Sequence, residues 1–161
     1  MAIDFGTLIL DEAPDAVVIT RLDGEVVHWT NGARMVFGYR SEEAVGRKLA
    51  ELIEVPGLDD GGAVVRQTLG AGAASYESVR RAKDGALVYI DSTSKLLRDA
   101  AGAPEYILWS KKDVTTLKVL RDAKLVEARF DGILELMPDA IIVANASGRI
   151  VLATRQAEAM F

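Results

Sequence analysis

The sequence predicts an antiparallel α+β domain, followed by a long helix and the start of a second domain of the same kind. Two observations lead to the first domain. Asp-Gly turn signals at 23–24 and 84–85 join short segments rich in β-branched residues, and helical segments separate these two hairpins. The predicted order is two strands, three helices and three strands. Strands joined by hairpins, with helices inserted between them, make an antiparallel α+β domain.

An internal repeat predicts the second domain. The segment LDEAPDAVVI at 10–19 returns as LELMPDAIIV at 134–143, an offset of 124 residues without a gap. Further pairs at this offset are Gly24–Gly148, Thr30–Thr154 and Phe37–Phe161. A repeat of this length is the size of a domain. We therefore expect one complete domain, a connector and the first part of a second domain.

Turn and cap residues mark the ends of the helices and strands that we expect in the first half of the domain. An apolar helix at 5–12 closes before Pro14, and strands at 15–20 and 26–30 flank the turn at Gly24. Thr30 or Asn31 can cap a helix that runs to Phe37 and ends at Gly38. Short helical segments follow at 41–44, which we expect Ser41 to cap, at 48–53 and at 62–69.

Three strands complete the domain, at 75–81, 86–97 and 105–111. The long middle strand alternates with a period of two. We take Ile90, Ser92 and Ser94 as its inner face, and we expect Asp91 and Lys95 to point outward.

Residues 115–137 predict a connector helix with an apolar stripe. Its members are spaced by four, three, four, three and four residues, the pattern of a left-handed coiled coil. They are Val119, Ala123, Val126, Phe130, Ile133 and Met137. We favour a parallel homodimer through this seam over a helix packed on its own domain. Gly132 weakens the helix by about 1 kcal/mol, and the like charges of Asp122 and Glu127 would face each other across a parallel pair.

Composition excludes several classes of protein. The net charge is −5 and the pI is near 5.0, which argues against a nucleic-acid or anionic-membrane binder. No apolar run reaches the ~18 residues of a membrane span, and the start carries no secretory signal. The chain has no cysteine, which excludes disulfides and thiolate metal sites and fits a cytoplasmic location.

Two consecutive segments, WTNGARMVFGY at 29–39 and SEEAVGR at 41–47, resemble a PAS sensor domain. The turn at 84–85, and Asp113, Val114 and Thr115 at the start of the connector, are similar to the closing (PAC) motifs of that family. The resemblance covers residues 5–115, and again 134–161. It implies a five-stranded antiparallel sheet with helices over one face, which enclose a pocket. It also implies signal relay through Asp113, Val114 and Thr115 into the connector helix.

One position departs from the family's pattern. Thr30 stands where the family usually has asparagine, and Thr154 stands there in the second copy. Threonine still caps a helix, but the extra hydrogen bonds of the amide are lost. Asn31 is one position late and does not inherit the role.

The available chemistry argues against the two best-known PAS cofactors. Covalent flavin photochemistry needs a cysteine, and haem needs an axial ligand, usually histidine. The only histidine, His28, falls on the second strand and not on the later helix where haem-binding members carry theirs. The sequence contains no nucleophile or acid–base constellation, so we expect neither an enzyme nor a metal site in this segment. The cofactor, if any, stays unknown.

A small apolar pocket is the best candidate site. We expect its lining to include Met35, Val65, Leu69, Tyr76, Ile90, Ser92, Ser94 and Trp109. The two inward serines need hydrogen-bond partners, because a buried unpaired hydroxyl is costly. A ligand or water could supply them, or these residues are plain core and the serines bond to each other or to the backbone.

Two functions follow from the resemblance. The first is the sensory input module of a bacterial-type multidomain signalling protein, which senses a small ligand or redox state and relays it to an output domain such as a histidine kinase. The second is a ligand-free interaction and dimerisation module. The expected organisation is a cap helix at 1–13, a PAS domain at 14–115, the connector at 116–137 and the start of a second PAS domain at 138–161.

Overall fold

The structure is a computed structural model that describes residues 4–58 and 61–160. Phe161, the repeat partner of Phe37, and residues 1–3 of the expected cap segment lie outside the described residues. The chain divides into two compact units, Met1–Thr116 and Leu117–Phe161.

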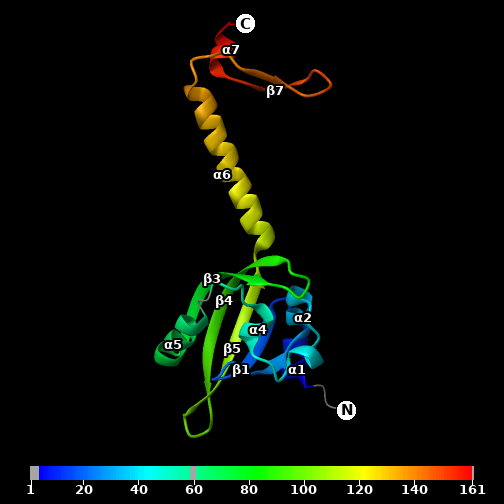
Figure 1. The fold of residues 1–161 in the computed structure, drawn as a ribbon, viewed down its shortest axis with the longest axis vertical. Helices are drawn as coiled ribbons and strands as arrows, with labels where there is room; N and C mark the ends of the chain where they lie inside the picture. The colour runs from blue at the N-terminus through cyan, green and yellow to red at the C-terminus, as the bar shows by residue number, and fades with distance from the viewer. Residues whose placement is uncertain (1–3, 59–60, 161) are drawn as a thin grey trace. The chain divides into compact units, whose positions relative to one another are not determined.

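The first unit is built on one antiparallel sheet. Its described elements are α1 (Phe5–Glu12), β1 (Ala16–Arg21), β2 (Val26–Trp29), α2 (Asn31–Phe37), α3 (Ser41–Ala44), α4 (Leu49–Ile53), α5 (Gly61–Ala71), β3 (Ala73–Arg81), β4 (Leu87–Arg98) and β5 (Pro104–Asp113). The sheet order is β2-β1-β5-β4-β3, and Figure 1 shows α2, α4 and α5 around the same face. The α+β prediction is confirmed. Four helices lie between β2 and β3 in the described residues, whereas the predicted order had three; the segment that ends at Phe37 and those expected at 41–44, 48–53 and 62–69 each form a helix.

The core lies between this face of the sheet and the helices. Apolar side chains from β1, β4 and β5 meet the buried faces of α2, α4 and α5. Trp29 packs against Phe37 and Tyr39, with ring centroids 5.9 and 6.4 Å apart, and its indole N–H donates to the Tyr39 carbonyl at 2.9 Å. Paired aromatic rings of this kind anchor the end of α2 to β2.

β4 has the predicted faces. Ile90, Ser92 and Ser94 are buried, whereas Asp91 and Lys95 are exposed. Successive side chains of a strand point to opposite faces of the sheet. A shift of one residue in strand pairing would therefore expose the buried face of β4, so burial of this face specifies the register with the neighbouring strands. Ser92 lies opposite Tyr76 of β3 and Lys111 of β5.

Thr30 caps α2 and ties it to β1. Its hydroxyl accepts from the N–H of Val17 at 3.1 Å and of Ala33 at 3.3 Å, and donates to the Val17 carbonyl at 2.9 Å. One buried hydroxyl therefore satisfies backbone groups of both a strand and a helix start. The threonine that replaces the family's usual asparagine thus caps the helix as expected.

The next helix differs from the prediction in its cap. Ser41 is the first residue of α3 and not its cap. The Arg40 N–H instead donates to the Glu43 carboxylate at 2.9 Å. Glu43 also pairs with Lys83 at 2.5 Å, and these contacts, led by the Lys83 hydrogen bond, lower the pKa of Glu43. Glu43, and not Ser41, therefore bonds the backbone at the start of this helix.

The second unit repeats the strand pairing of the first hairpin and the two N–H bonds to its threonine cap. Its elements are most of α6 (Thr115–Leu136), then β6 (Ile142–Ala144), β7 (Ile150–Ala153) and α7 (Arg155–Met160). The Thr154 hydroxyl accepts from the N–H of Ile141 at 3.0 Å and of Ala157 at 3.4 Å, matching Thr30 at the offset of 124. Gly148 takes the positive φ of Gly24, 80° against 86°. The repeat is thus structural as well as sequential.

The core of this second unit is small. Leu134, Thr154 and Ala157 are buried, whereas Ile142, Val143, Ile150 and Val151 are exposed. A two-stranded hairpin with its apolar side chains in water is marginally stable at best.

None of the helices in the described part of the chain has both the length and the hydropathy that a membrane span needs.

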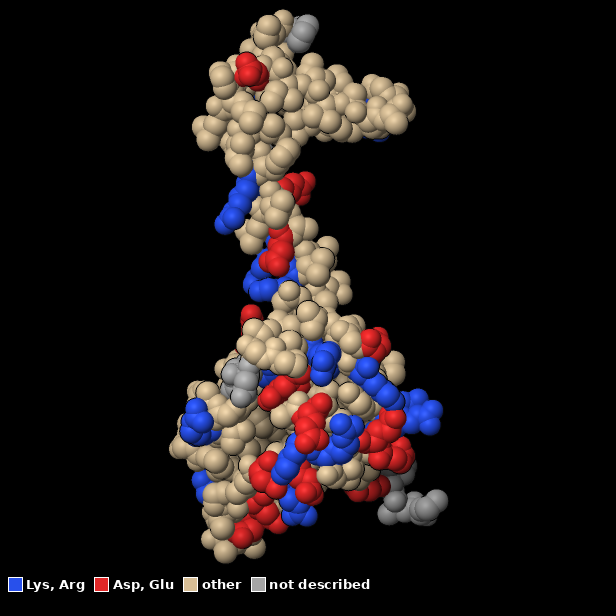
Figure 2. Space-filling view, in the orientation of Figure 1, with Lys and Arg blue, Asp and Glu red and all other residues tan. Residues whose placement is uncertain are grey.

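Charges are interspersed on the surface. Acidic and basic side chains alternate over the first unit on the face that Figure 2 shows. In the view drawn, β6, β7 and α7 carry few charges.

Gly32 is required by a close approach between α2 and the segment before β1. A Cβ at this position would lie 2.2 Å from the Asp15 carbonyl oxygen and 2.7 Å from that of Ala13. Both neighbours are backbone atoms, which move only with the chain. We expect Gly32→Ala to lower the free energy of unfolding by about 1–3 kcal/mol, as overpacking does. Urea denaturation measures it.

Gly70→Ala is the matched control, since Gly70 is also helical and, apart from its chain neighbours and the adjacent backbone of its own helix, no atom lies within 4 Å of an added Cβ. It should raise stability by up to about 1 kcal/mol, because alanine favours helix. Equal effects of the two substitutions would contradict the close approach.

Candidate functional site

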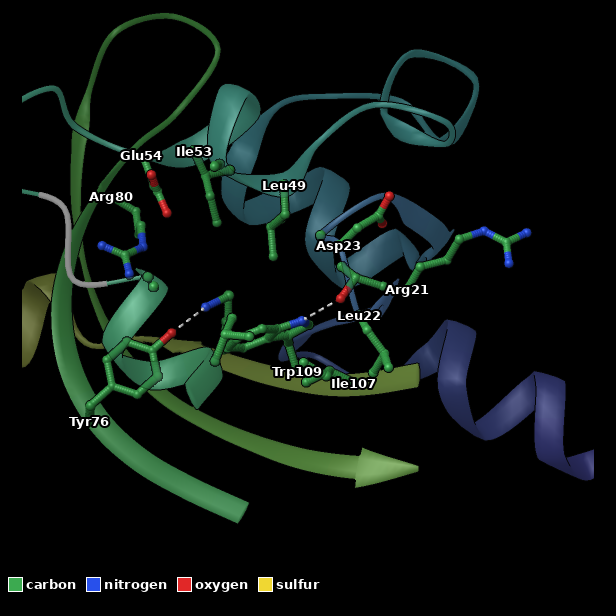
Figure 3. Close-up of a pocket in the computed structure, with 17 residues that line it drawn as sticks. Arg21, Leu22, Asp23, Leu49, Ile53, Glu54, Tyr76, Arg80, Ile107 and Trp109 are labelled. Carbon is green, nitrogen blue, oxygen red and sulfur yellow. Dashed lines mark hydrogen bonds between the residues drawn. The ribbon is translucent and has the colours of Figure 1, made fainter. Parts of the chain in front are cut away.

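A cavity of about 340 Å³ lies between the inner face of the sheet and helices α4 and α5. Its walls come from β1 and the turn after it, from α4, from the start of α5 and from β3 and β5 (Figure 3). The residues that line it are Thr20, Arg21, Leu22, Asp23, Gly24, Leu49, Ala50, Ile53, Glu54, Gly61, Gly62, Val65, Tyr76, Arg80, Ile107, Trp109 and Lys111. Small-molecule sites have volumes from roughly 300 Å³ upward, so a small ligand fits.

Trp109 forms the middle of the cavity wall. Its indole N–H donates to the Thr20 hydroxyl at 3.0 Å, the dashed line on the right of Figure 3. Both residues are buried. The bond links β5 to β1 and holds the ring flat along the cavity, with Leu49 and Ile53 on the helix side.

Lys111 is the unusual residue of the site. Only 1% of it is exposed, and its ammonium donates to the Tyr76 hydroxyl and to the Ser92 hydroxyl, both at 3.2 Å. The ammonium also lies 4.9 Å from the centre of the Trp109 ring and 5.5 Å from that of Tyr76. Lysine is almost never fully buried unless its charge is stabilised. Two aromatic faces and two hydroxyls hold this cation inside the domain.

Further charged side chains line the cavity. Arg80 of β3 is 3% exposed, and its guanidinium lies 5.9 Å from the centre of the Tyr76 ring. Figure 3 places Arg80 and Glu54 at one end and Asp23 and Arg21 at the other. The Lys48 ammonium, 2.7 Å from the Asp23 carboxylate, and the Glu25 N–H hold the pKa of Asp23 below its ordinary value.

Three of the predicted lining residues line this cavity and two lie elsewhere on the surface. Val65, Tyr76 and Trp109 are in its wall. Met35 is 77% exposed, because Ala33 and Phe37 form the buried side of α2 and Met35 is about 200° around the helix from Ala33. Leu69 is 37% exposed and stands outside the wall, since it is about 40° further than Val65 from the buried side of α5.

The other three predicted residues lie behind the wall. Ile90 is in the core, and Ser92 contacts the cavity through Lys111. The Ser94 hydroxyl lies 2.6 Å from that of Thr68, which donates to the Val64 carbonyl, and it also donates to the Ala74 carbonyl at 3.5 Å. The serines thus use side chains and backbone as partners, though they do not bond to each other.

The sequence analysis missed Lys111 and Arg80. Alternation along β5 offered the signal, because Ile107, Trp109 and Lys111 are spaced by two and share a face. A lysine in such a pattern is normally taken as the exposed end of the strand. His28 lies on β2 opposite Ile19, among the described residues outside the cavity wall.

The start of α6 is bonded to the middle of the sheet. The Tyr89 N–H of β4 donates to the Thr115 hydroxyl at 3.0 Å, and the Val114 N–H donates to the Tyr89 carbonyl at 2.9 Å. The Asp113 carboxylate accepts from the Thr115 N–H at 2.9 Å, where negative charge suits the helix start. The three predicted relay residues therefore lie together, directly after the last cavity residue of β5.

The comparison with known families agrees with this geometry. A family model described as PAS fold matches residues 4–114. The chain belongs to the PAS family. A second model, described as PAS domain, matches residues 128–161, which gives limited support to the second copy. No curated protein matched the sequence.

Solved structures agree on the fold. The PAS domain of a protein from Colwellia psychrerythraea is 24% identical, with a TM-score of 0.65 over 70% of this chain and 96% of that one. An RNA-binding light-oxygen-voltage receptor is 21% identical, with a TM-score of 0.66 over 78% of this chain and 36% of that one. A PAS domain from a two-component sensor histidine kinase is 14% identical, with a TM-score of 0.57 over 68% and 93%. At these identities the likeness concerns the PAS fold alone.

We expect Thr20→Val to lower the free energy of unfolding by about 1–3 kcal/mol, because it leaves the buried Trp109 N–H without its acceptor. Valine keeps the shape of threonine, so packing changes little. Thr93→Val on the exposed face of β4 is the control and should stay within about 0.5 kcal/mol of wild type. Urea denaturation of both variants measures this, and equal losses would show that the bond is not stabilising.

Proposed function

We propose that this chain is the sensory input module of a bacterial-type multidomain signalling protein. It senses a small ligand in the cavity and relays its presence through α6 to an output domain such as a histidine kinase. One observation carries the proposal: the cavity and the start of α6 share a strand. Trp109 and Lys111 line the cavity, and β5 ends two residues later at Asp113.

This connection gives a ligand a physical route to the helix. A ligand shifts an equilibrium only by the difference in its affinity for two states. If it contacts Trp109 or Lys111, it favours one position of β5, and β5 continues directly into Asp113, Val114 and Thr115. The bonds from Tyr89 hold that junction to β4, so a shift of β5 against β4 alters the start of α6.

The solved relatives support a signalling context. One of them is a PAS domain from a two-component sensor histidine kinase, a class of protein in which an input domain controls a kinase. The nature of the output, the sensing of redox state and a cytoplasmic location remain predictions from the sequence.

The alternative, a ligand-free dimerisation module, is favoured by α6. Its apolar stripe is exposed within this chain: Val119 by 56%, Val126 by 67%, Phe130 by 58% and Ile133 by 55%. Ala123, on the same stripe, is exposed as well. Such a row of apolar side chains suits a parallel coiled coil with a second copy. Dimerisation is compatible with sensing, so the two candidates differ only in whether the cavity holds a ligand.

Protein purified from cells without refolding tests the difference. We expect mass spectrometry of the denatured protein to release one small organic molecule in near one-to-one ratio, and the absorption spectrum to lack a flavin or Soret band. Removal of that molecule should change backbone hydrogen exchange at residues 113–120. An empty cavity with unchanged exchange would favour the ligand-free module.

The relay has its own matched pair of variants. Thr115→Val removes the acceptor of the Tyr89 N–H and should abolish the ligand-dependent change in exchange, while ligand binding persists. Thr116→Val, at the exposed next position, should keep the change. If both variants respond like wild type, the signal does not pass through this junction.

We expect the double variant Val126→Glu and Phe130→Glu to halve the mass measured by light scattering. Two charges per chain would be buried without partners in the seam, which costs several kcal/mol. The control, Leu125→Glu and Ala128→Glu, adds the same charges off the stripe and should stay dimeric. An unchanged mass for the first variant would remove α6 as the dimer seam.

A further inference from the structure

The face of the sheet opposite the cavity carries an apolar patch at its centre. It consists of Val17 and Ile19 on β1 and of Tyr106 and Leu108 on β5, and it is called the outer patch below. All four side chains are half-buried, and none of them belongs to the core or packs against it in the described part of the chain. We infer that the outer patch is an interface with a second copy of this chain. This interface does not depend on a ligand in the cavity, so it goes beyond the sensory function.

The outward side chains of β1 and β5 differ from those of β4. Helices α2, α4 and α5 lie around the other face of the sheet (Figure 1). An antiparallel sheet with one solvated face normally alternates apolar residues inside with polar residues outside. β4 follows this rule, with Asp91, Thr93 and Lys95 exposed on its outer side. β1 and β5 break it on two adjacent strands, and a contiguous apolar surface of this kind marks a site of protein–protein contact.

The pairing of β1 with β5 makes the outer patch self-complementary. Ile19 lies opposite Leu108 in this antiparallel ladder. When two sheets pack face to face about a two-fold axis along these strands, each β1 residue faces its own ladder partner on the other copy. Ile19 of each copy then contacts Leu108 of the other, as an isologous interface requires. Aligned packing is one of the two usual arrangements of stacked sheets.

Charged residues at both ends of the outer patch fit the same axis. At one end Arg21 lies opposite Tyr106, so the guanidinium meets the aromatic ring of the other copy. At the other end the register continues to Asp15, one residue before β1, opposite Lys112 on β5. A carboxylate of each copy therefore meets an ammonium of the other. This charge complementarity identifies a second copy of the chain as the occupant of the patch.

A two-fold axis across the strands is less favourable. Lys95 of β4 lies opposite Leu108 in the β4–β5 ladder. An axis across the strands at Leu108 places the two Lys95 ammonium groups against each other, and like charges that face each other in an interface are unfavourable. With the axis along the strands, both copies of β5 end on the same side. Both chains then enter α6 side by side and in the same direction, as the proposed parallel seam needs.

A single introduced thiol tests the interface, because the chain has no cysteine. Leu108→Cys places the thiol in the middle of the outer patch. Ser75→Cys is the control, since Ser75 is exposed on the same face of β3, at the edge of the sheet. At equal protein concentration a short bis-maleimide should give at least tenfold more covalent dimer with Leu108→Cys than with Ser75→Cys, measured by denaturing electrophoresis. Dimerisation through α6 alone would cross-link both variants alike, so equal yields would overturn the inference.

A second pair of variants adds one charge per chain on the same face. Ile19→Glu buries a carboxylate against Leu108 of the other copy and should raise the dimer dissociation constant at least tenfold, measured by analytical ultracentrifugation. Ser75→Glu adds the same charge outside the outer patch and should leave the constant unchanged. Urea denaturation checks that both variants fold, and if Ile19→Glu does not fold, the cross-linking result decides. Equal dissociation constants for two folded variants, or a wild-type chain that stays monomeric at all concentrations, would also overturn the interface, while the release of a small molecule from the cavity would still support the sensory function.

Discussion

The bridge made by the Thr30 hydroxyl is the constraint on which the rest of the domain depends. It joins the N–H and carbonyl of Val17 on β1 to the first turn of α2. With α2 held there, Gly32 passes within van der Waals contact of the backbone before β1, and Phe37 reaches Trp29. In the second copy the Thr154 hydroxyl accepts from the two equivalent N–H groups, those of Ile141 and Ala157, but it donates to the Asp139 carbonyl, and Gln156 stands where the first copy has Gly32. The cap is therefore common to both copies, whereas the close approach belongs to the first.

Strand β5 supplies the central part of the cavity wall. It lies at the centre of the sheet, between β1 and β4, and its inner face presents Ile107, Trp109 and Lys111. The bond from Trp109 to Thr20 fixes it to β1, and the bonds from Lys111 to Tyr76 and Ser92 fix it to β3 and β4. The same strand ends at Asp113, and α6 begins at Thr115.

Lys111 is buried although burying a charged group has a cost in desolvation. A hydrophobic residue of similar size would fill the space at less cost in desolvation. The cation instead places a directional, charged group among apolar walls.

The elements that depend on local chemistry could be predicted from the sequence. The Asp-Gly turns, the Thr30 cap, the alternation of Ile90, Ser92 and Ser94, and the repeat at 124 residues are all properties of neighbours along the chain, and the structure has each of them. Which side chains contact one another depends on how distant elements pack, and this could not be predicted from the sequence. Met35 and Leu69 are apolar, as the residues that line a pocket usually are, but their positions on α2 and α5 point them outward. Lys111 and Arg80 are charged, as surface residues usually are. They are nevertheless buried, because strand alternation points them inward, where they lie against the Tyr76 ring. A residue's type sets the free energy of burying it, but the packing of elements distant in the sequence sets whether it is buried.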